Sequence, residues 1–195
     1  SSDVCSSDLF AGLALKENDL STALAYCLCF QGLLRPCEAF SLIPSSIDFH
    51  PNLISAVLSL MSSKSFTRSG DREQVIIDDP FVLVLLTLWK SSNSDGLPWI
   101  LKQANFRAIF NRHVCSLGFP LGHYKPYSLR RGGATLLFKI SQSYDHVAQR
   151  GRWLHTRTAK IYINQAQAEL AAQRLTPAQK AKVTRFSTAF LSFAS

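Results

Sequence analysis

The stretch Tyr127-Ser-Leu-Arg-Arg-Gly-Gly-Ala-Thr135, with Arg150-Gly-Arg-Trp-Leu-His-Thr-Arg-Thr-Ala-Lys-Ile-Tyr162 after it, decides the fold of this chain. From Tyr127 to Tyr162 the chain carries a single acid, Asp145, and five guanidinium groups, on Arg130, Arg131, Arg150, Arg152 and Arg157. A guanidinium is a planar, permanently charged fork of donors that holds phosphate oxygens bidentately. A tyrosine that follows such a cluster on a short helix could be a phenolic nucleophile held against a phosphate. The residues alone favour the simpler alternative, a basic nucleic-acid-binding face on which Tyr162 only packs.

The positive charge is concentrated in the second half of the chain. Residues 1–100 hold 6 Lys and Arg against 11 Asp and Glu, whereas residues 101–195 hold 15 against 2, and the net charge is +8. This asymmetry indicates a polyanionic partner on one face, with nucleic acid favoured over an anionic membrane. The 195 residues, 47% of them hydrophobic, suffice for one globular domain with a sizeable core.

The cysteines and the apolar runs argue against several classes of protein. The five cysteines include no Cys-x-x-Cys pair, which disfavours a disulfide framework or a zinc site and favours a reducing compartment. The longest apolar run, residues 81–89, is far shorter than the roughly 20 residues of a transmembrane helix. We therefore expect no metal, no cofactor and no membrane partner. The expected location is intracellular, in the nucleus of a eukaryote or the cytoplasm of a bacterium.

The first residues look foreign to the rest of the chain. Residues 1–10 read Ser-Ser-Asp-Val-Cys and then Ser-Ser-Asp-Leu-Phe, and the chain does not begin with Met. This near-repeat resembles translated sequencing-adapter read-through at the end of an incomplete reading frame. We expect residues 1–10 to lie outside the fold, residues 1–18 to be a non-native or remnant segment, and an N-terminal portion to be missing. Residues 19–172 would form the main domain and residues 173–195 a C-terminal helix.

Hydrophobic periodicity, caps and turn residues predict an α+β, mostly helical fold with a small antiparallel β-hairpin sheet. The expected helices cover residues 19–30, 36–42, 80–89, 102–117, 129–140, 145–150, 156–172 and the segment from 177 onward. The expected strands cover residues 53–61 and 74–78, joined by a polar segment with a Gly70-Asp71 turn signal. The expected N-caps are Asp19 or Ser21, Ser128 and Thr156. Lys64 falls near the end of the first strand and, taken alone, is an ordinary solvated lysine.

Several side chains have both a structural and a functional interpretation. Arg130 and Arg131 would lie in the first turn of a helix, where backbone N–H groups favour an anion. Arg35 and Glu38 are three residues apart, commonly a surface ion pair, yet an arginine in an apolar stretch requires a partner if it is buried. His113 lies on an apolar stripe and is expected to be a packed core histidine. The phenylalanines of the last helix could equally pack on this chain or bind a partner.

Taken in order, these segments resemble the catalytic domain of the tyrosine recombinases, the phage-integrase family, over about residues 20–170. Residues 32–42 with Ile47-Asp48 are similar to the first-arginine box, and Ser128-Leu-Arg130 with Gly-Gly-Ala-Thr resembles the second. The matching positions are Arg35, Glu38, the hairpin lysine Lys64, Arg130, and Trp153 nine residues before Tyr162. Each box is weak alone, but five in the right order are specific. A looser resemblance, to the products of recombinase-like genes of eukaryotic mobile elements, rests on the sequences Arg-Arg-Gly-Gly-Ala-Thr and Arg-Gly-Arg-Trp.

The resemblance implies DNA strand cleavage and rejoining in site-specific recombination or integration. Arg35 and Arg130 would clamp the phosphate oxygens, supported by Glu38, and the Trp153 indole would add a donor. Lys64 would protonate the departing 5′-hydroxyl, and Tyr162 would form a 3′-phosphotyrosine without metal or cofactor. The partners would be double-stranded DNA and further copies of the chain, assembled as a tetramer, with residues 177–195 as the exchanged helix. The remaining expected DNA contacts are Arg131, Arg150, Arg152 and Arg157.

Two departures from the family pattern are visible. Tyr127 occupies the position of the usual histidine, three residues before Arg130, and a neutral phenol is a poor proton acceptor near pH 7. Tyr127 could position the phosphate, His123 or His155 could supply the imidazole, or the enzyme could be slow or inactive. Residues 1–18 cannot provide the family's separate DNA-gripping domain, so we expect weak, salt-dependent binding through phosphates.

Three alternatives remain open from the sequence. The first is a catalytically degenerate DNA-binding remnant, which Tyr127 favours and the otherwise complete set of matching residues disfavours. The second is a type IB topoisomerase-like enzyme, which shares the chemistry, although the short chain and the Arg-Pro-Cys-Glu sequence favour a recombinase. The third is a basic helical domain that binds RNA or membranes and forms no covalent adduct with DNA.

Overall fold

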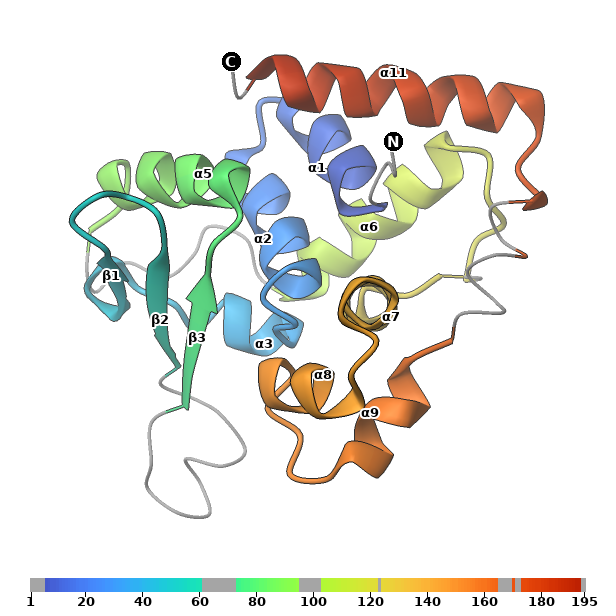
Figure 1. The fold of residues 1–195 in the computed structure, drawn as a ribbon. Helices are drawn as coiled ribbons and strands as arrows, with labels where there is room; N and C mark the ends of the chain where they lie inside the picture. Colours follow the sequence, from blue (N-terminus) through green and yellow to red (C-terminus); the bar gives the residue numbers. More distant parts are fainter. Residues whose placement is uncertain are drawn as a thin grey trace.

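The chain folds into a helical body with a small sheet at one side (Figure 1). The computed structural model describes residues 6–60, 73–94, 103–122, 124–164, 170 and 173–193. The helices are α1 (Ser6–Lys16), α2 (Leu20–Phe30), α3 (Pro36–Ala39), α5 (Pro80–Ser91), α6 (Gln103–Ser116), α7 (Tyr127–Ser141), α8 (Tyr144–Arg150), α9 (Thr156–Tyr162) and α11 (Pro177–Phe193). A 3-10 turn (Pro44–Ser46) precedes strands β1 (Ile47–Phe49), β2 (Ala56–Leu60) and β3 (Glu73–Ile77). The predicted α+β, mostly helical class is confirmed.

Helix α2 forms the centre of the core. Its residues from Thr22 to Phe30 are all buried, as an almost entirely apolar sequence requires. Asp19 caps it by accepting a hydrogen bond from the backbone N–H of Thr22 at 2.9 Å. Of the two N-caps considered for this helix, Asp19 and Ser21, Asp19 is the one observed. The helix packs against α1, α5 and α7 (Figure 1), so the strongly basic α7 is anchored directly on the most buried element.

Within the described residues the sheet has three antiparallel strands in the order β1-β2-β3, one more than the two predicted. β1 pairs with β2 in the register Ile47↔Leu58, and β2 pairs with β3 in the register Leu58↔Val75. The prediction that the first hairpin strand begins at Leu53 is wrong, because Leu53 has a φ of +53° in an exposed turn before β2. β1 was missed because three residues are too short to show an alternating pattern.

The expectation that residues 1–10 lie outside the fold is wrong for residues 6–10, which begin α1. Leu9 and Phe10 are buried, and the Phe10 ring stacks on Phe110 at a centroid distance of 5.1 Å. The apolar residues of this segment continue into a helix that packs on α2 and α11, so α1 is part of the core. Residues 1–5 lie outside the described part of the chain.

His113 on α6 is a core histidine, as predicted. It is 1% exposed, its Nδ1 lies 2.9 Å from the Tyr26 hydroxyl, and its Nε2 lies 3.3 Å from a Glu17 carboxylate oxygen. Burial lowers its pKa, while the hydrogen bond and charge of Glu17 oppose that shift. The ring therefore stays neutral in the folded protein near neutral pH.

Three predicted helix boundaries are wrong. Helix α7 begins at Tyr127 with Pro126 before it, so Ser128 is not the N-cap. Helix α9 follows His155, which makes Thr156 its first residue and not its cap. The predicted continuation of this helix to residue 172 fails, because α9 ends at Tyr162 and the backbone of Ile163 is extended. This early end leaves Tyr162 at a helix terminus, free of a following helical turn.

The last helix, α11, lies across α1 and against the end of α6 (Figure 1). Gln179 Nε2 donates to the Gly118 carbonyl at 2.9 Å, Lys182 Nζ donates to the Ser116 carbonyl at 2.7 Å, and Val183 packs on the core. In this chain the helix therefore docks on its own domain through its first turns. Among the helices that the structure describes, none has the length and apolar character needed to cross a membrane.

Candidate active site

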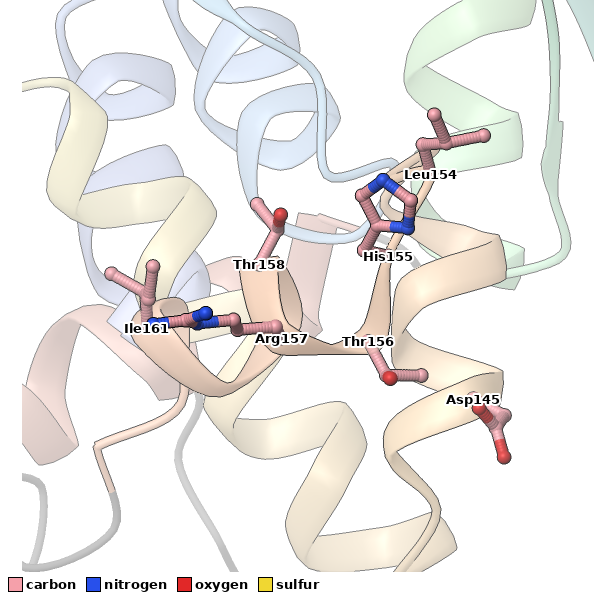
Figure 2. Close-up of a pocket in the computed structure, with 7 residues that line it drawn as sticks. All are labelled: Asp145, Leu154, His155, Thr156, Arg157, Thr158 and Ile161. Carbon is pink, nitrogen blue, oxygen red and sulfur yellow. The ribbon is translucent and has the colours of Figure 1, made fainter.

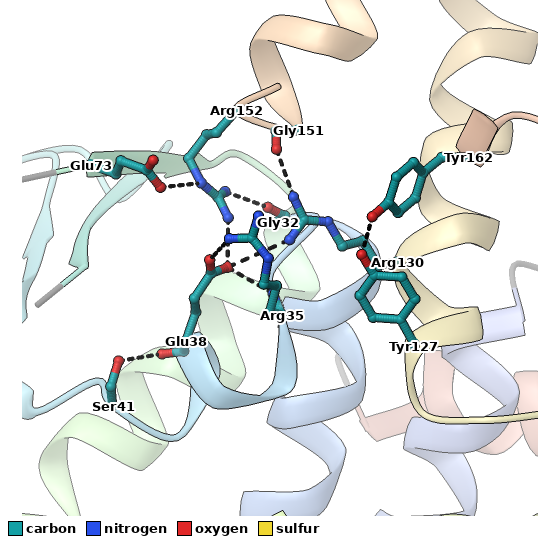
Figure 3. Close-up of polar contacts among 10 residues, drawn as sticks. All are labelled: Gly32, Arg35, Glu38, Ser41, Glu73, Tyr127, Arg130, Gly151, Arg152 and Tyr162. Atoms are coloured by element: carbon teal, nitrogen blue, oxygen red, sulfur yellow. Dashed lines mark hydrogen bonds and ion pairs between the residues drawn. The ribbon is translucent and has the colours of Figure 1, made fainter. Parts of the chain in front are cut away.

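A cluster of arginines gathers around one buried carboxylate between α3, α7 and the α8–α9 connection (Figure 3). Pro36 begins α3, which makes Arg35 the residue before the helix and places Glu38 in its first turn. Glu38 Oε2 accepts a hydrogen bond from the Arg35 backbone N–H at 2.7 Å, and Glu38 Oε1 contacts Arg35 Nη1. The Glu38 side chain is 1% exposed, so the Arg35–Glu38 pair is not a solvated surface pair. A buried carboxylate requires a positively charged partner, and Arg35 supplies one.

Three guanidinium groups share the Glu38 carboxylate. Besides Arg35, Arg152 Nη2 lies 2.7 Å from Glu38 Oε2, and Arg130 Nη1 lies 3.7 Å from the same oxygen. A second carboxylate, Glu73 at the start of β3, binds Arg152 Nε at 3.1 Å. Three cations against two carboxylates leave a surplus positive charge in a largely buried environment. Such a site favours an anion.

Arg130, in the first turn of α7, has the most unusual environment in the cluster. Its side chain is fully buried, and its only side-chain hydrogen bond to a described residue runs from Nη2 to the Gly151 carbonyl at 2.7 Å. Nε and Nη1 are buried without a hydrogen-bond partner. Burial, together with the charges of Arg152 and Arg35, lowers the pKa of Arg130 to about 10, so it remains a cation at pH 7.

Trp153 lies beside Arg130 and contributes the third unsatisfied donor in the described residues. Its side chain is 8% exposed, and the indole Nε1–H is buried without a partner. The Arg130 guanidinium carbon lies 5.1 Å from the Trp153 ring centroid. The Trp153 and Tyr162 ring centroids lie 4.3 Å apart. Buried donors without a partner cost about 1–3 kcal/mol each. Three of them in one place indicate a site that is completed by an acceptor-rich ligand.

Tyr162 and Tyr127 meet at the edge of this cluster. Tyr127 is the first residue of α7 and Tyr162 the last residue of α9, and their hydroxyls are hydrogen-bonded (Figure 3). Burial raises the pKa of Tyr127 to about 12, assisted by its hydrogen bond to Tyr162 and opposed by the charges of Arg130 and Arg35. Tyr127 is therefore a neutral phenol at pH 7, a donor and not a base.

The position of Tyr162 is fixed from α7. Arg131 Nη2 donates to the Ile161 carbonyl at 3.4 Å, and Thr135 Oγ1 lies 3.5 Å from the Tyr162 carbonyl. The Asn164 backbone N–H then donates to Thr135 Oγ1 at 3.2 Å. Thr135 was missed as a site residue, although its position four residues after Arg131 puts both on one face of the helix.

The other predicted DNA contacts have different environments. Arg152 is 9% exposed and its guanidinium binds Glu38 and Glu73, so its predicted contact with DNA stays a prediction. Arg150 Nη2 pairs with Asp78 at 2.7 Å, whereas Arg131 and Arg157 are exposed. Lys64, the predicted hairpin lysine, lies outside the described residues, as does His123.

His155 and Arg157 line a separate surface hollow (Figure 2). Its volume is about 650 Å³, and none of its lining residues belongs to the Glu38 cluster. The side chain of His155 is exposed before the first turn of α9. Within the described part of the chain, no group of three or more His, Cys, Asp or Glu is placed to hold a metal ion.

Comparison with known proteins identifies the fold. Neither a protein-family model nor a curated protein sequence matches this chain. A post-cleavage complex of the XerH site-specific recombinase with palindromic difH matches with a TM-score of 0.61 at 18% identity, over 87% of this chain and 50% of that chain. A pre-cleavage complex matches with a TM-score of 0.62 at 17% identity, over 89% and 53%. This chain thus spans about half the length of these proteins, and the likeness establishes the fold.

Proposed function

We propose that this chain, which has the fold of a tyrosine recombinase catalytic domain, cuts and rejoins DNA through Tyr162. The observation that carries the proposal is the group of three unsatisfied buried donors, two on Arg130 and one on Trp153, beside the Tyr162 phenol. A phosphodiester supplies the oxygen acceptors and the negative charge that this group lacks. Aromatic packing alone would not bury unpaired donors at this point.

The bound phosphate would be held from three directions. Because these donors are buried in the free protein, binding would require neighbouring side chains to move. Arg130 Nε and Nη1 and Trp153 Nε1 would then donate to the non-bridging oxygens, and Arg35, half-buried at the rim, would add a second guanidinium. Burial opposes the charge of Arg35, but the Glu38 carboxylate outweighs this effect and raises the pKa of Arg35. Donors already positioned where charge develops stabilise the transition state without reorganising during the reaction.

The chemical step would exchange one phosphoester for another. The Tyr162 oxygen attacks phosphorus, the bond from phosphorus to the 5′-oxygen breaks, and a 3′-phosphotyrosine forms. Lys64 would protonate the leaving oxygen, as the family resemblance implies. Tyr127, a neutral phenol, would donate its hydrogen bond to the Tyr162 oxygen as negative charge develops there, and the proton of Tyr162 would pass to water. Because a phosphoester is retained, the reverse step rejoins the strand without ATP.

The substrate would be double-stranded DNA in site-specific recombination or integration, as in a mobile element. Arg131 and Arg157 are exposed on α7 and α9 and would contact neighbouring phosphates. Arg150 on α8 would add a further contact. The structural neighbours are recombinases bound to DNA substrates, which supports this partner. Assembly of several copies on paired sites, with exchange of α11, stays a prediction.

The test is a search for a covalent protein–DNA adduct. The protein is incubated with supercoiled plasmid at low salt, and the products are separated in denaturant. We expect relaxed plasmid and an adduct from the wild type, and neither from Tyr162→Phe. Tyr144→Phe is the matched control, because Tyr144 stacks on Phe138 outside the cluster and should leave the adduct unchanged. An adduct that persists in Tyr162→Phe would contradict the proposal.

A second candidate function is a DNA-binding remnant without turnover. The observation that favours it is Tyr127, whose phenol takes the place of the family's usual histidine and cannot act as a base at pH 7. This candidate predicts salt-dependent DNA binding with no adduct from any variant. Relaxation of single plasmids with no exchange between two sites would instead favour the topoisomerase-like alternative.

A further inference from the structure

Arg152 combines an unfavourable backbone conformation with two largely buried ion pairs. Its φ is +56°, a left-handed value that residues other than glycine and asparagine rarely adopt. Its guanidinium binds Glu38 at 2.7 Å and Glu73 at 3.1 Å, and it approaches the Gly32 carbonyl at 3.4 Å. An arginine kept in such a conformation between two functional neighbours, Gly151 and Trp153, requires a reason.

The contacts with Glu38 suggest what that reason is. Glu38 Oε2 already accepts from the Arg35 backbone N–H and from Arg152 Nη2, both at 2.7 Å. Arg130 Nη1 stands 3.7 Å from this oxygen, beyond hydrogen-bond distance. Arg152 thus occupies the carboxylate that Arg130 would otherwise bind. This competition accounts for the unpaired Arg130 Nη1, and Arg130 Nε is also buried without a hydrogen-bond partner.

We propose that Arg152 is a positioning residue that occupies Glu38 and so keeps the donors of Arg130 free for a phosphate. It does not contact DNA itself. The proposal rests on the proposed function in that the phosphate belongs to the DNA backbone. Through Glu73 at the start of β3, Arg152 also joins the sheet to the turn that carries Trp153 (Figure 3).

The first test separates positioning from DNA contact. In Arg152→Gln, we expect single-turnover adduct formation at saturating DNA to fall at least about 10-fold, with partial recovery in Arg152→Lys. The slope of log affinity against log salt should stay at the wild-type value, because no phosphate contact is lost. Arg157→Gln, at an exposed arginine, should reduce that slope by about 1. A reduced slope in Arg152→Gln together with an unchanged adduct rate would overturn the proposal.

The second test needs no catalysis and therefore separates failure of this proposal from failure of the proposed function. Thermal unfolding is compared in inorganic phosphate and in chloride of equal ionic strength. We expect phosphate to stabilise the wild type and Arg112→Gln, an exposed arginine on α6 that pairs with Glu17, but not Arg152→Gln. The double variant Arg152→Gln with Glu38→Gln should regain the phosphate effect, since the freed carboxylate is gone.

Two outcomes of this second test would refute the role of Arg152. One is a phosphate effect in Arg152→Gln equal to that of the wild type, and the other is no phosphate effect in the wild type. If Arg152→Gln fails to fold, Arg152→Lys takes its place. Because a lysine keeps one charged contact with Glu38 but loses the second contact with Glu73, we then expect a phosphate effect smaller than that of the wild type but not abolished, and an effect equal to the wild type would refute the role. A wild type that phosphate stabilises but that forms no adduct would refute only the proposed function.

Discussion

Glu38→Gln is the substitution on which the architecture of the site depends most. The glutamine keeps the shape of the side chain and one oxygen acceptor but removes the charge that three guanidiniums share. Arg35 is partly exposed and Arg152 retains Glu73, so the largest loss falls on Arg130, which is fully buried. Removing one partner of a buried ion pair costs about 3–5 kcal/mol. We expect a loss near the lower end, about 3 kcal/mol.

The measurement is urea unfolding followed by fluorescence or circular dichroism. Glu73→Gln is the matched control, since Glu73 is 17% exposed and pairs with one arginine, and we expect it to lose about 1 kcal/mol or less. Phosphate should restore part of the lost stability in Glu38→Gln, because the surplus positive charge rises by one. Equal losses in the two variants, or no effect of phosphate, would refute the reasoning that Glu38 organises the cluster.

Three further predictions follow from single contacts. Gly133→Ala should destabilise the fold by about 3 kcal/mol in thermal unfolding, because a Cβ would lie 2.0 Å from the Phe30 carbonyl oxygen. Gly132→Ala, at the half-buried neighbouring position, is the control and should not have this effect. Equal effects of the two variants would contradict the close packing of Gly133 against α2. Tyr127→Phe should slow adduct formation roughly 5–10-fold through loss of one hydrogen bond worth about 1 kcal/mol, and an unchanged single-turnover rate would exclude that role. Stability should fall as the pH drops below about 6.5, since the unfolded chain binds a proton at His113 more readily than the folded one, and His113→Gln should flatten this dependence in unfolding at pH 5 to 7.

Features that depend on residues close together in the sequence could be predicted from local sequence patterns. The apolar sequence of α2 and its Asp19 cap predict a buried helix, and Arg35 and Glu38 predict an ion pair because they are three positions apart. The resemblance of the arginine, tryptophan and tyrosine segments to a known family implies that they lie close together, and Arg130, Trp153 and Tyr162 are in contact in the structure.

Features that arise from contacts distant in the sequence could not be predicted. In the sequence, Arg152 is indistinguishable from a surface arginine, because its partners Glu38 and Glu73 are 114 and 79 residues away. The role of Thr135 depends likewise on the end of α9, which it meets only in the folded chain. The prediction for residues 6–10 was wrong because it relied on the near-repeat of the first ten residues. It gave too little weight to the apolar pattern that begins at Leu9 and Phe10 and continues along α1.

The measurement that tests the central claim most directly is identification of the residue that carries the DNA. A protein–DNA adduct trapped on plasmid would be digested with nuclease and protease, and the nucleotide-bearing peptide sequenced by mass spectrometry. The chain holds five tyrosines, so the assignment is unambiguous. We predict the nucleotide on Tyr162, joined through its 3′-phosphate. A nucleotide on Tyr127, its hydrogen-bonded neighbour, or on any other residue would contradict the assignment of Tyr162 as the nucleophile.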